Sequence, residues 1–338
     1  MSNQATVLAS LNAGLRAALA EDARVIVLGE DVLDPYGGAF KVTRGLSAQF
    51  PDRVLTTPIS EAGIVAVATG MALRGFRPVV EIMFGDFLFL AGDQIVNHAA
   101  KYRAMFNGQV RVPLVVRTPM GGRRGYGPTH SQSLEKHFLG VPGLWVVAPH
   151  ALLDPGALLR QAITTDDPVL FVESKIGYGE PIRDAVPGYK MIRLADAGAP
   201  FPTVWLEPAA PADGLILCYG GTVPLAIEAA AFLRDREQLN LGLVVVSQLS
   251  PTPASHLDAI LRDAAPSVLV TLEESPAEAG WGTEMIAAIE RGRDAQALGA
   301  IAYRRVGAKN APIPAARDLE DGVLPQVADV VAAVLDCV

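Results

Sequence analysis

The stretch Thr56-Thr57-Pro58-Ile59-Ser60-Glu61-Ala62-Gly63-Ile64 joins a predicted strand, residues 54–57, to a strongly apolar predicted helix, residues 64–73. Strand followed by helix is the repeating unit of α/β sheets, which bind ligands at the carboxyl ends of their strands. Glu61 stands at this junction among apolar neighbours, where its charged form is poorly solvated. We interpret it as a candidate proton-transfer group. A first-turn glutamate that the helix dipole stabilises is an equally good interpretation of the local sequence.

Short apolar runs of strand character alternate with helical patterns through both halves of the chain. In the first half we predict strands at residues 24–28, 54–57, 78–83, 112–117, 144–148 and 169–173, and helices at 4–20, 64–73, 90–104 and 155–162. In the second half we predict strands at residues 215–219, 241–246, 267–272 and 301–305, and helices at 223–233, 253–263, 283–291 and 326–336. Strands separated by such helices imply right-handed crossovers and parallel sheets covered on both faces. The sequence therefore predicts an α/β protein with two doubly wound domains.

Residues 175–211 interrupt the alternation, because glycine and proline recur there and no periodic element persists. We predict a larger N-terminal domain at residues 1–180, a linker at 181–211 that can contribute edge strands, and a smaller C-terminal domain at 212–338. A chain of 338 residues is long enough for two hydrophobic cores.

The composition excludes several classes of partner and compartment. Half of the residues are hydrophobic and the net charge is −8, which favours a large subunit interface and disfavours nucleic acid or an anionic membrane surface. Cys218 and Cys337 cannot form a disulfide framework, so a reducing compartment is expected. No apolar run reaches membrane-spanning length without a charge, and the N-terminus lacks the pattern of a signal peptide. We therefore expect a cytoplasmic protein that does not enter a membrane.

Four parts of the first half carry a resemblance to a known family. They are Gly29-Glu30-Asp31-Val32 with Gly37-Gly38-Ala39-Phe40-Lys41-Val42-Thr43, the Glu61 stretch, Glu81-Ile82-Met83-Phe84-Gly85-Asp86-Phe87, and Arg117-Thr118-Pro119-Met120-Gly121-Gly122 with Gly127-Pro128-Thr129-His130-Ser131-Gln132. In this order they resemble the β subunit of the E1 component of 2-oxo acid dehydrogenase complexes, which are thiamine-diphosphate enzymes related to transketolase. The resemblance runs nearly end to end. It implies an N-terminal domain of the pyrimidine-binding type and a transketolase-like C-terminal domain for dimerisation and core docking.

The resemblance also implies roles for four residues. Glu61 matches the glutamate that hydrogen-bonds the aminopyrimidine ring of thiamine diphosphate, and His130 matches a histidine that reaches the substrate. Phe87 is expected to stack on the aminopyrimidine, and Glu30 matches an acidic residue near the cofactor. For Phe87 taken alone, ordinary core packing is the commoner role.

The same resemblance implies sites for two metal ions, K⁺ and Mg²⁺. Residues 162–168 resemble a structural potassium site, whose expected ligands are Leu114, Ala162, Ile163, Thr165 and Asp167. Relatives often carry Asp or Asn where Thr165 stands, and a plain helix-ending turn explains the segment equally well. The chain has no Gly-Asp-Gly segment of the kind that holds Mg²⁺ and diphosphate. The resemblance therefore implies a split site, with Mg²⁺ held mainly by an α subunit in an α₂β₂ heterotetramer.

The predicted function is that of an E1 β subunit, which decarboxylates a 2-oxo acid and reductively acylates the lipoyl group of an E2 acyltransferase core. Pyruvate and branched-chain 2-oxo acids both stay open as substrates. One alternative uses the same cofactor for a different reaction: the chain is then the β-type subunit of an acetoin dehydrogenase or of a transketolase-like enzyme that transfers ketol or acyloin groups. A second alternative is a non-catalytic partner subunit. Assays with the α chain distinguish the three functions. Release of CO₂ indicates the dehydrogenase, an aldehyde or sugar product indicates the first alternative, and no turnover indicates a non-catalytic subunit.

Overall fold

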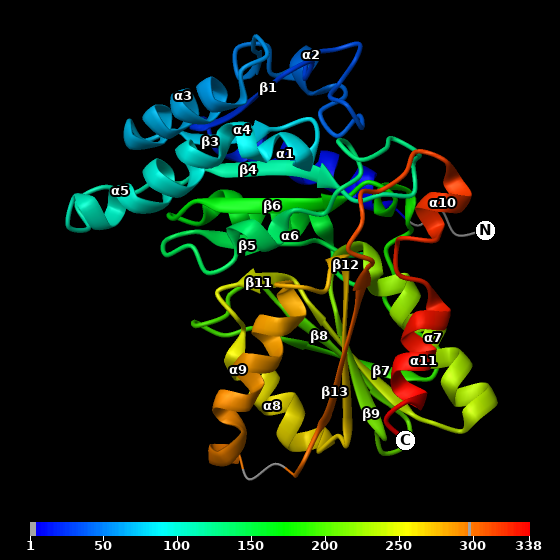
Figure 1. The fold of residues 1–338 in the computed structure, drawn as a ribbon. Helices are drawn as coiled ribbons and strands as arrows, with labels where there is room; N and C mark the ends of the chain where they lie inside the picture. Colours follow the sequence, from blue (N-terminus) through cyan, green and yellow to red (C-terminus); the bar gives the residue numbers. More distant parts are fainter. Residues whose placement is uncertain (1–4, 297–298) are drawn as a thin grey trace. The chain divides into compact units, whose positions relative to one another are not determined.

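The computed structural model describes residues 5–296 and 299–338, which form two units, each built around its own sheet (Figure 1). Unit 1 comprises residues 1–121 and 137–182, and unit 2 comprises residues 122–136 and 183–338. Gln4, where the first helix was predicted to begin, lies outside the described residues.

Unit 1 contains a parallel sheet with the strand order β5–β6–β4–β3–β1–β2. The strands are β1 Val25–Gly29, β2 Val54–Thr56, β3 Arg77–Glu81, β4 Val115–Met120, β5 Trp145–Val147 and β6 Val169–Ser174. Most of their residues are buried and apolar, as expected for parallel strands that helices cover on both faces. The six predicted strands are all present, although their ends shift because apolar residues continue into the flanking loops.

The predicted helices of unit 1 are present in the predicted order, and a short helix that was not predicted, α2, lies between the first two. The helices are α1 Val7–Glu21, α2 Leu46–Gln49, α3 Glu61–Leu73, α4 Leu88–Asp93, α5 Ala100–Met105 and α6 Pro155–Thr164. The helix predicted at residues 90–104 is interrupted by a π-helical turn, η2 Gln94–Ala99, between α4 and α5. Helices α1 and α6 approach so closely that a Cβ on Gly156 would lie 2.1 Å from the carbonyl oxygen of Ser10. Only glycine fits that contact.

Unit 2 contains a mixed sheet with the order β13–β12–β9–β10–β8–β7. Its parallel strands are β9 Gly214–Cys218, β10 Leu241–Val246, β12 Val268–Pro276 and β13 Ala302–Ala308. Its helices are α7 Val223–Glu237, α8 Ala254–Ala264, α9 Trp281–Gln296, α10 Arg317–Asp321 and α11 Val327–Leu335. In Figure 1, α8 and α9 lie on one face of this sheet, and α7 and α11 lie on the other.

Two strands of unit 2 arise from the segment predicted as a linker. β7 Tyr189–Leu194 and β8 Thr203–Pro208 pair with each other in antiparallel register, and β8 also pairs antiparallel with β10. The sequence allowed edge strands in this segment, but prolines and glycines around the short runs left their positions undefined. β7 lies at the edge of the sheet, whereas β8 lies inside it, between β10 and β7. A further short strand, β11 Gln248–Ser250, follows β10.

Both units are therefore α/β, which confirms the predicted fold class. Among the described helices, none combines the length and the apolar character that crossing a membrane requires.

Candidate active site

Two buried glutamates stand at the carboxyl ends of neighbouring strands in unit 1. Glu30 directly follows β1, and Glu61 opens α3 shortly after β2. The two strands are parallel, with Gly29 opposite Thr56, so the segments that leave them begin side by side. This is the edge at which α/β sheets bind their ligands.

In the pair Glu30 and Glu61, one carboxylate oxygen has no hydrogen-bond partner among the described residues. Burial raises the pKa of Glu30, and the charge of Glu61 raises it further, against a backbone hydrogen bond from Ser60. Oε1 of Glu30 is buried and has no hydrogen-bond partner among the residues that the structure describes. In folded proteins, a buried carboxylate oxygen nearly always accepts a hydrogen bond from a donor. The arrangement therefore fits a polar ligand that donates to one carboxyl group or shares a proton with the other.

The position of Glu61 satisfies both interpretations of the sequence. It occupies the first turn of α3, where the helix dipole favours a negative charge. A glutamate needed only for that purpose would be expected at the surface, whereas Glu61 is buried. Burial next to a second carboxyl group is a costly arrangement that favours a functional role.

Phe87 lies in an aromatic cluster of unit 1. It ends the short 3₁₀ turn η1, Gly85–Phe87, and its ring meets that of Phe84 edge to face with 5.9 Å between centroids. Phe84 in turn packs against Phe40 at 5.7 Å. Phe87 is only half-buried. Packing accounts for part of its surface, and stacking on a cofactor stays a prediction.

A fully buried charge network, which was not predicted from the sequence, crosses three adjacent strands. Arg117 on β4 donates from Nε and Nη2 to the two carboxylate oxygens of Glu173 on β6, at 2.9 and 2.6 Å. Its Nη1 donates to Glu81 on β3. Burial opposes the charge of Arg117, but the carboxylates of Glu173 and Glu81 raise its pKa above the usual value. The guanidinium therefore remains protonated.

This network also fixes the loop that carries the Gly37-Gly38-Ala39 motif. The backbone N–H of Ala39 donates to Oε1 of Glu81 at 3.3 Å. A Cβ on Gly38, whose φ is +81°, would lie 2.5 Å from the same oxygen. The signal in the sequence was an ionisable residue near the end of three apolar strands. The strand order needed to interpret it was not available from spacing.

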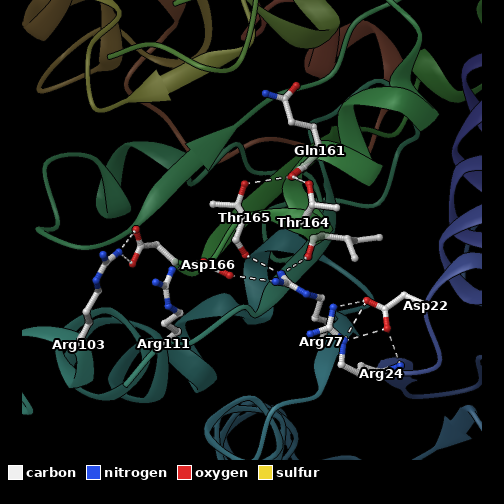
Figure 2. Close-up of polar contacts among 11 residues, drawn as sticks. Asp22, Arg24, Arg77, Arg103, Arg111, Gln161, Thr164, Thr165 and Asp166 are labelled. Carbon is white, nitrogen blue, oxygen red and sulfur yellow. Dashed lines mark hydrogen bonds and ion pairs between the residues drawn. The ribbon is translucent and has the colours of Figure 1, made fainter. Parts of the chain in front are cut away.

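Arg77 already occupies part of the predicted potassium site, as Figure 2 shows for its contacts near Thr165 and Asp166. Nη1 of Arg77 donates to the carbonyl oxygens of Ile163 and Thr165 at 2.9 and 3.2 Å. Nη2 of Arg77 donates to Asp166 at 2.9 Å. A guanidinium thus stands where two of the five predicted ligand oxygens converge.

The other three predicted potassium ligands are engaged as well. The carbonyl oxygens of Leu114 and Ala162 accept from backbone N–H groups at 2.8 and 3.2 Å. Both carboxylate oxygens of Asp167 accept from Arg103. Potassium binding at these oxygens stays a prediction, and no part of the proposed function depends on it.

His130 belongs to unit 2, within residues 122–136, which we call the His130 segment. It is half-buried, and its Nδ1 lies 3.0 Å from the hydroxyl oxygen of Thr129. Near the end of the segment, buried Glu135 accepts a hydrogen bond from the hydroxyl group of Tyr219. The segment therefore has its own attachments within unit 2.

Glu135 makes the stability of unit 2 depend on pH. Burial raises its pKa to about 7, although the hydrogen bond from Tyr219 opposes that rise. An unfolded glutamate titrates near 4.3, so between that pH and about 7 the folded state binds more protons. This contribution to stability is complete below the unfolded pKa and is lost as the pH rises through the folded pKa. The loss is roughly 4 kcal/mol, the equivalent of a shift between these two pKa values.

We expect Glu135→Gln to remove this dependence, because its neutral amide imitates the protonated acid. The free energy of unfolding of the variant, measured with urea from pH 4.5 to 8, should fall less steeply than that of the unchanged chain. Glu228→Gln, at an exposed position on α7, is the control and should keep the original slope. An unchanged slope in Glu135→Gln would contradict the assignment.

Both units match known domain families. Residues 3–181 match the transketolase pyrimidine-binding domain, and residues 209–330 match the transketolase C-terminal domain. A solved split-gene transketolase, an inactive β4 tetramer, has the same fold, with a TM-score of 0.73 and 19% identity over 99% of this chain and 98% of that chain. Fold and domain matches together define a transketolase-type protein of the thiamine-diphosphate class.

Curated relatives narrow this class. The pyruvate dehydrogenase E1 component subunit beta-2 of Oryza sativa subsp. japonica is 35% identical over 98% of this chain and 86% of its own length. The 3-methyl-2-oxobutanoate dehydrogenase subunit beta of Mycobacterium tuberculosis is 35% identical over 84% of this chain and 79% of its own. The chain belongs to the family of E1 β subunits of 2-oxo acid dehydrogenases. Membership implies dependence on thiamine diphosphate and an α-subunit partner within a dehydrogenase complex.

A third relative is named for a different activity. The acetoin:2,6-dichlorophenolindophenol oxidoreductase subunit beta of Cupriavidus necator is 34% identical over 98% of this chain and 97% of its own length. Its identity to this chain is close to that of the two dehydrogenases, so overall similarity does not choose among their substrates.

Proposed function

We propose that this chain, with an α subunit in an α₂β₂ heterotetramer, decarboxylates a 2-oxo acid and reductively acylates a lipoyl group of an E2 core. The observation that carries the proposal is the buried pair Glu30 and Glu61 at the carboxyl ends of β1 and β2, with one carboxylate oxygen unpaired. Such a pair suits a ring that carries both a hydrogen-bond donor and a proton-accepting nitrogen. The aminopyrimidine of thiamine diphosphate is such a ring.

The residues of this chain have separate tasks around the cofactor. When bound, thiamine diphosphate supplies the nucleophilic carbon and accepts the electron pair that CO₂ leaves behind. Glu61 holds a proton at N1′ of the pyrimidine, and poorly hydrated surroundings strengthen that hydrogen bond. The raised pKa of Glu30 limits repulsion between the two carboxyl groups. Its unpaired Oε1 accepts a polar hydrogen of the ligand.

Phe87 and His130 complete the proposed set. Phe87 packs on the pyrimidine and excludes water from the hydrogen bond of Glu61. His130 donates a proton to the carbonyl oxygen of the substrate, since a positioned imidazole group is the side chain that most often transfers protons in enzymes. These two assignments rest on the sequence motifs and on their partial exposure.

The surface of unit 1 supports a partner subunit. Helices α3, α4 and α5, with the residue that follows α5, expose large apolar side chains, namely Val67, Phe89, Leu90, Met105 and Phe106. Exposed apolar side chains of this size on neighbouring helices favour a protein interface. We propose that the α subunit covers them and brings Mg²⁺ and the diphosphate ligands.

A second candidate function is acetoin cleavage, because the acetoin relative is as similar to this chain as the dehydrogenases are. The test is the β chain purified with its α chain, thiamine diphosphate and Mg²⁺, and supplied in turn with pyruvate, 3-methyl-2-oxobutanoate and acetoin. The proposal predicts CO₂ release from a 2-oxo acid with reduction of an artificial electron acceptor. Acetaldehyde from acetoin, with no CO₂ from either acid, would favour the second candidate. No turnover with any substrate would support a non-catalytic subunit.

A further inference from the structure

Glu320, on α10, binds the backbone of the His130 segment. Its Oε1 lies 2.8 Å from the backbone nitrogen of Arg123, and its Oε2 lies 3.1 Å from that of Gly125. The glutamate side chain is 1% exposed. A buried carboxylate that accepts from two amide groups makes strong, directional hydrogen bonds.

Arg123 needs this support because of its backbone conformation. Its φ of +66° lies in the left-handed region, which is unfavourable for a residue with a side chain. Its guanidinium donates to the carbonyl oxygen of Pro325 at 2.6 Å and reaches Asp321 at 3.4 Å. The backbone and the side chain of Arg123 therefore both form hydrogen bonds with the same turn, residues 320–325.

Packing leaves the segment little space to move against this turn. A Cβ on Gly122 would lie 2.6 Å from Cδ1 of Leu324 and 3.0 Å from Oε1 of Glu320. Leu324 belongs to a small apolar cluster with Ala308 and Ile313, so the turn is anchored in the body of unit 2.

The two ends of the segment are also attached to the end of β12. The backbone N–H of Gly122 donates to Glu274 at 2.7 Å, and Nζ of Lys136 donates to the carbonyl oxygen of Pro276 at 3.2 Å. His130 lies between these attachments. Its location within unit 2 thus depends on contacts made by residues far away in the chain.

We propose that Glu320 is a positioning residue for the E1 reaction. It holds the His130 segment in the conformation that presents His130 to the substrate, and it does so through the backbone of Arg123 and Gly125. This inference rests on the proposed function of His130. Without the carboxylate, the backbone amides of Arg123 and Gly125 lose their acceptor and the strained turn at Arg123 relaxes.

Glu320→Gln is the sharpest test because the substitution preserves size. The amide oxygen of glutamine can accept from one N–H, but its NH₂ group then faces the other N–H as a second donor. Glu273→Gln is the matched control. Glu273 is also a buried carboxylate of unit 2, and it accepts from the backbone N–H groups of Trp281 and Gly282 at 2.8 and 2.9 Å. Those amides begin α9 and do not belong to the His130 segment.

The experiment compares both variants in the E1 enzyme reassembled with its α chain. Hydrogen exchange of residues 122–127 should accelerate about tenfold or more in Glu320→Gln, because amides that lose their hydrogen-bond acceptor open more readily. The kcat should fall about tenfold, while the KM and the affinity for thiamine diphosphate change less than about threefold. Glu273→Gln should lower the melting temperature comparably but leave the exchange of residues 122–127 and the kcat near their original values.

Two outcomes would overturn the proposal. One is an exchange rate of residues 122–127 in Glu320→Gln within about twofold of the unchanged enzyme, an effect smaller than the loss of a hydrogen bond to a charged group. The other is an equal loss of kcat in Glu273→Gln, which would reduce the role of Glu320 to general stability. If the unchanged enzyme turns over no substrate, the proposed function fails instead. The exchange comparison then still decides whether Glu320 holds the segment.

Discussion

Glu61→Gln should lower the turnover of the reassembled E1 enzyme by about 100-fold to 10,000-fold, the range expected when a positioned proton-transfer group is lost. Glutamine has the same size, so the packing of this buried side chain at the start of α3 should persist. The amide cannot hold a proton at the pyrimidine nitrogen as a carboxylate does. The measurement is kcat with the best 2-oxo acid substrate, together with the melting temperature of the β chain.

The control for Glu61 is another first-turn glutamate. Glu284 lies in the first turn of α9 and is exposed. If Glu61 served only the helix dipole, both substitutions to glutamine would cost a few tenths of a kcal/mol to about 1 kcal/mol and leave kcat unchanged. We expect Glu284→Gln to behave in this way. Near-normal turnover in Glu61→Gln would refute its proposed role.

Arg117→Met should destabilise unit 1 by about 3–5 kcal/mol, the usual cost of removing one partner from a buried ion pair. The substitution keeps most of the side-chain volume but leaves Glu81 and Glu173 buried without their shared cation. Burial of two uncompensated carboxylates is the main penalty. The free energy of unfolding, measured with urea at neutral pH, reports this loss.

Arg103→Met is the matched control for the buried network. Arg103 also binds a carboxylate, that of Asp167 at 2.6 Å, but its side chain is 47% exposed. Because solvent screens an exposed pair, we expect this variant to lose less than about 1 kcal/mol. Equal losses in the two arginine variants would contradict the account of the buried network.

Much of the fold could be predicted from periodicity, because each strand of unit 1 is an apolar run with a clear boundary. β8 shows the limit of this approach. Its residues are largely buried, yet prolines at both ends made the segment look like a linker. Antiparallel pairing with β10 stabilises it, and that contact is visible only once the chain has folded.

Some residues of the candidate site could likewise be predicted from the sequence, and others could not. Glu30 and Glu61 could be identified because each follows a strand, and strand ends are where α/β sheets bind ligands. The partnership of Glu320 with Arg123 could not, because the two residues are 197 positions apart and neither belongs to a motif. Likewise, Glu81 and Glu173 become partners of Arg117 only through the order β3–β4–β6.

The structure of the α₂β₂ enzyme with thiamine diphosphate bound tests the central claim most directly. The measured quantity is the distance from the carboxylate of Glu61 to N1′ of the aminopyrimidine ring. The account predicts a hydrogen bond of about 2.6–3.2 Å, with Oε1 of Glu30 also paired to a donor. A pyrimidine ring bound away from Glu61, with both glutamates still buried against their own chain, would contradict it.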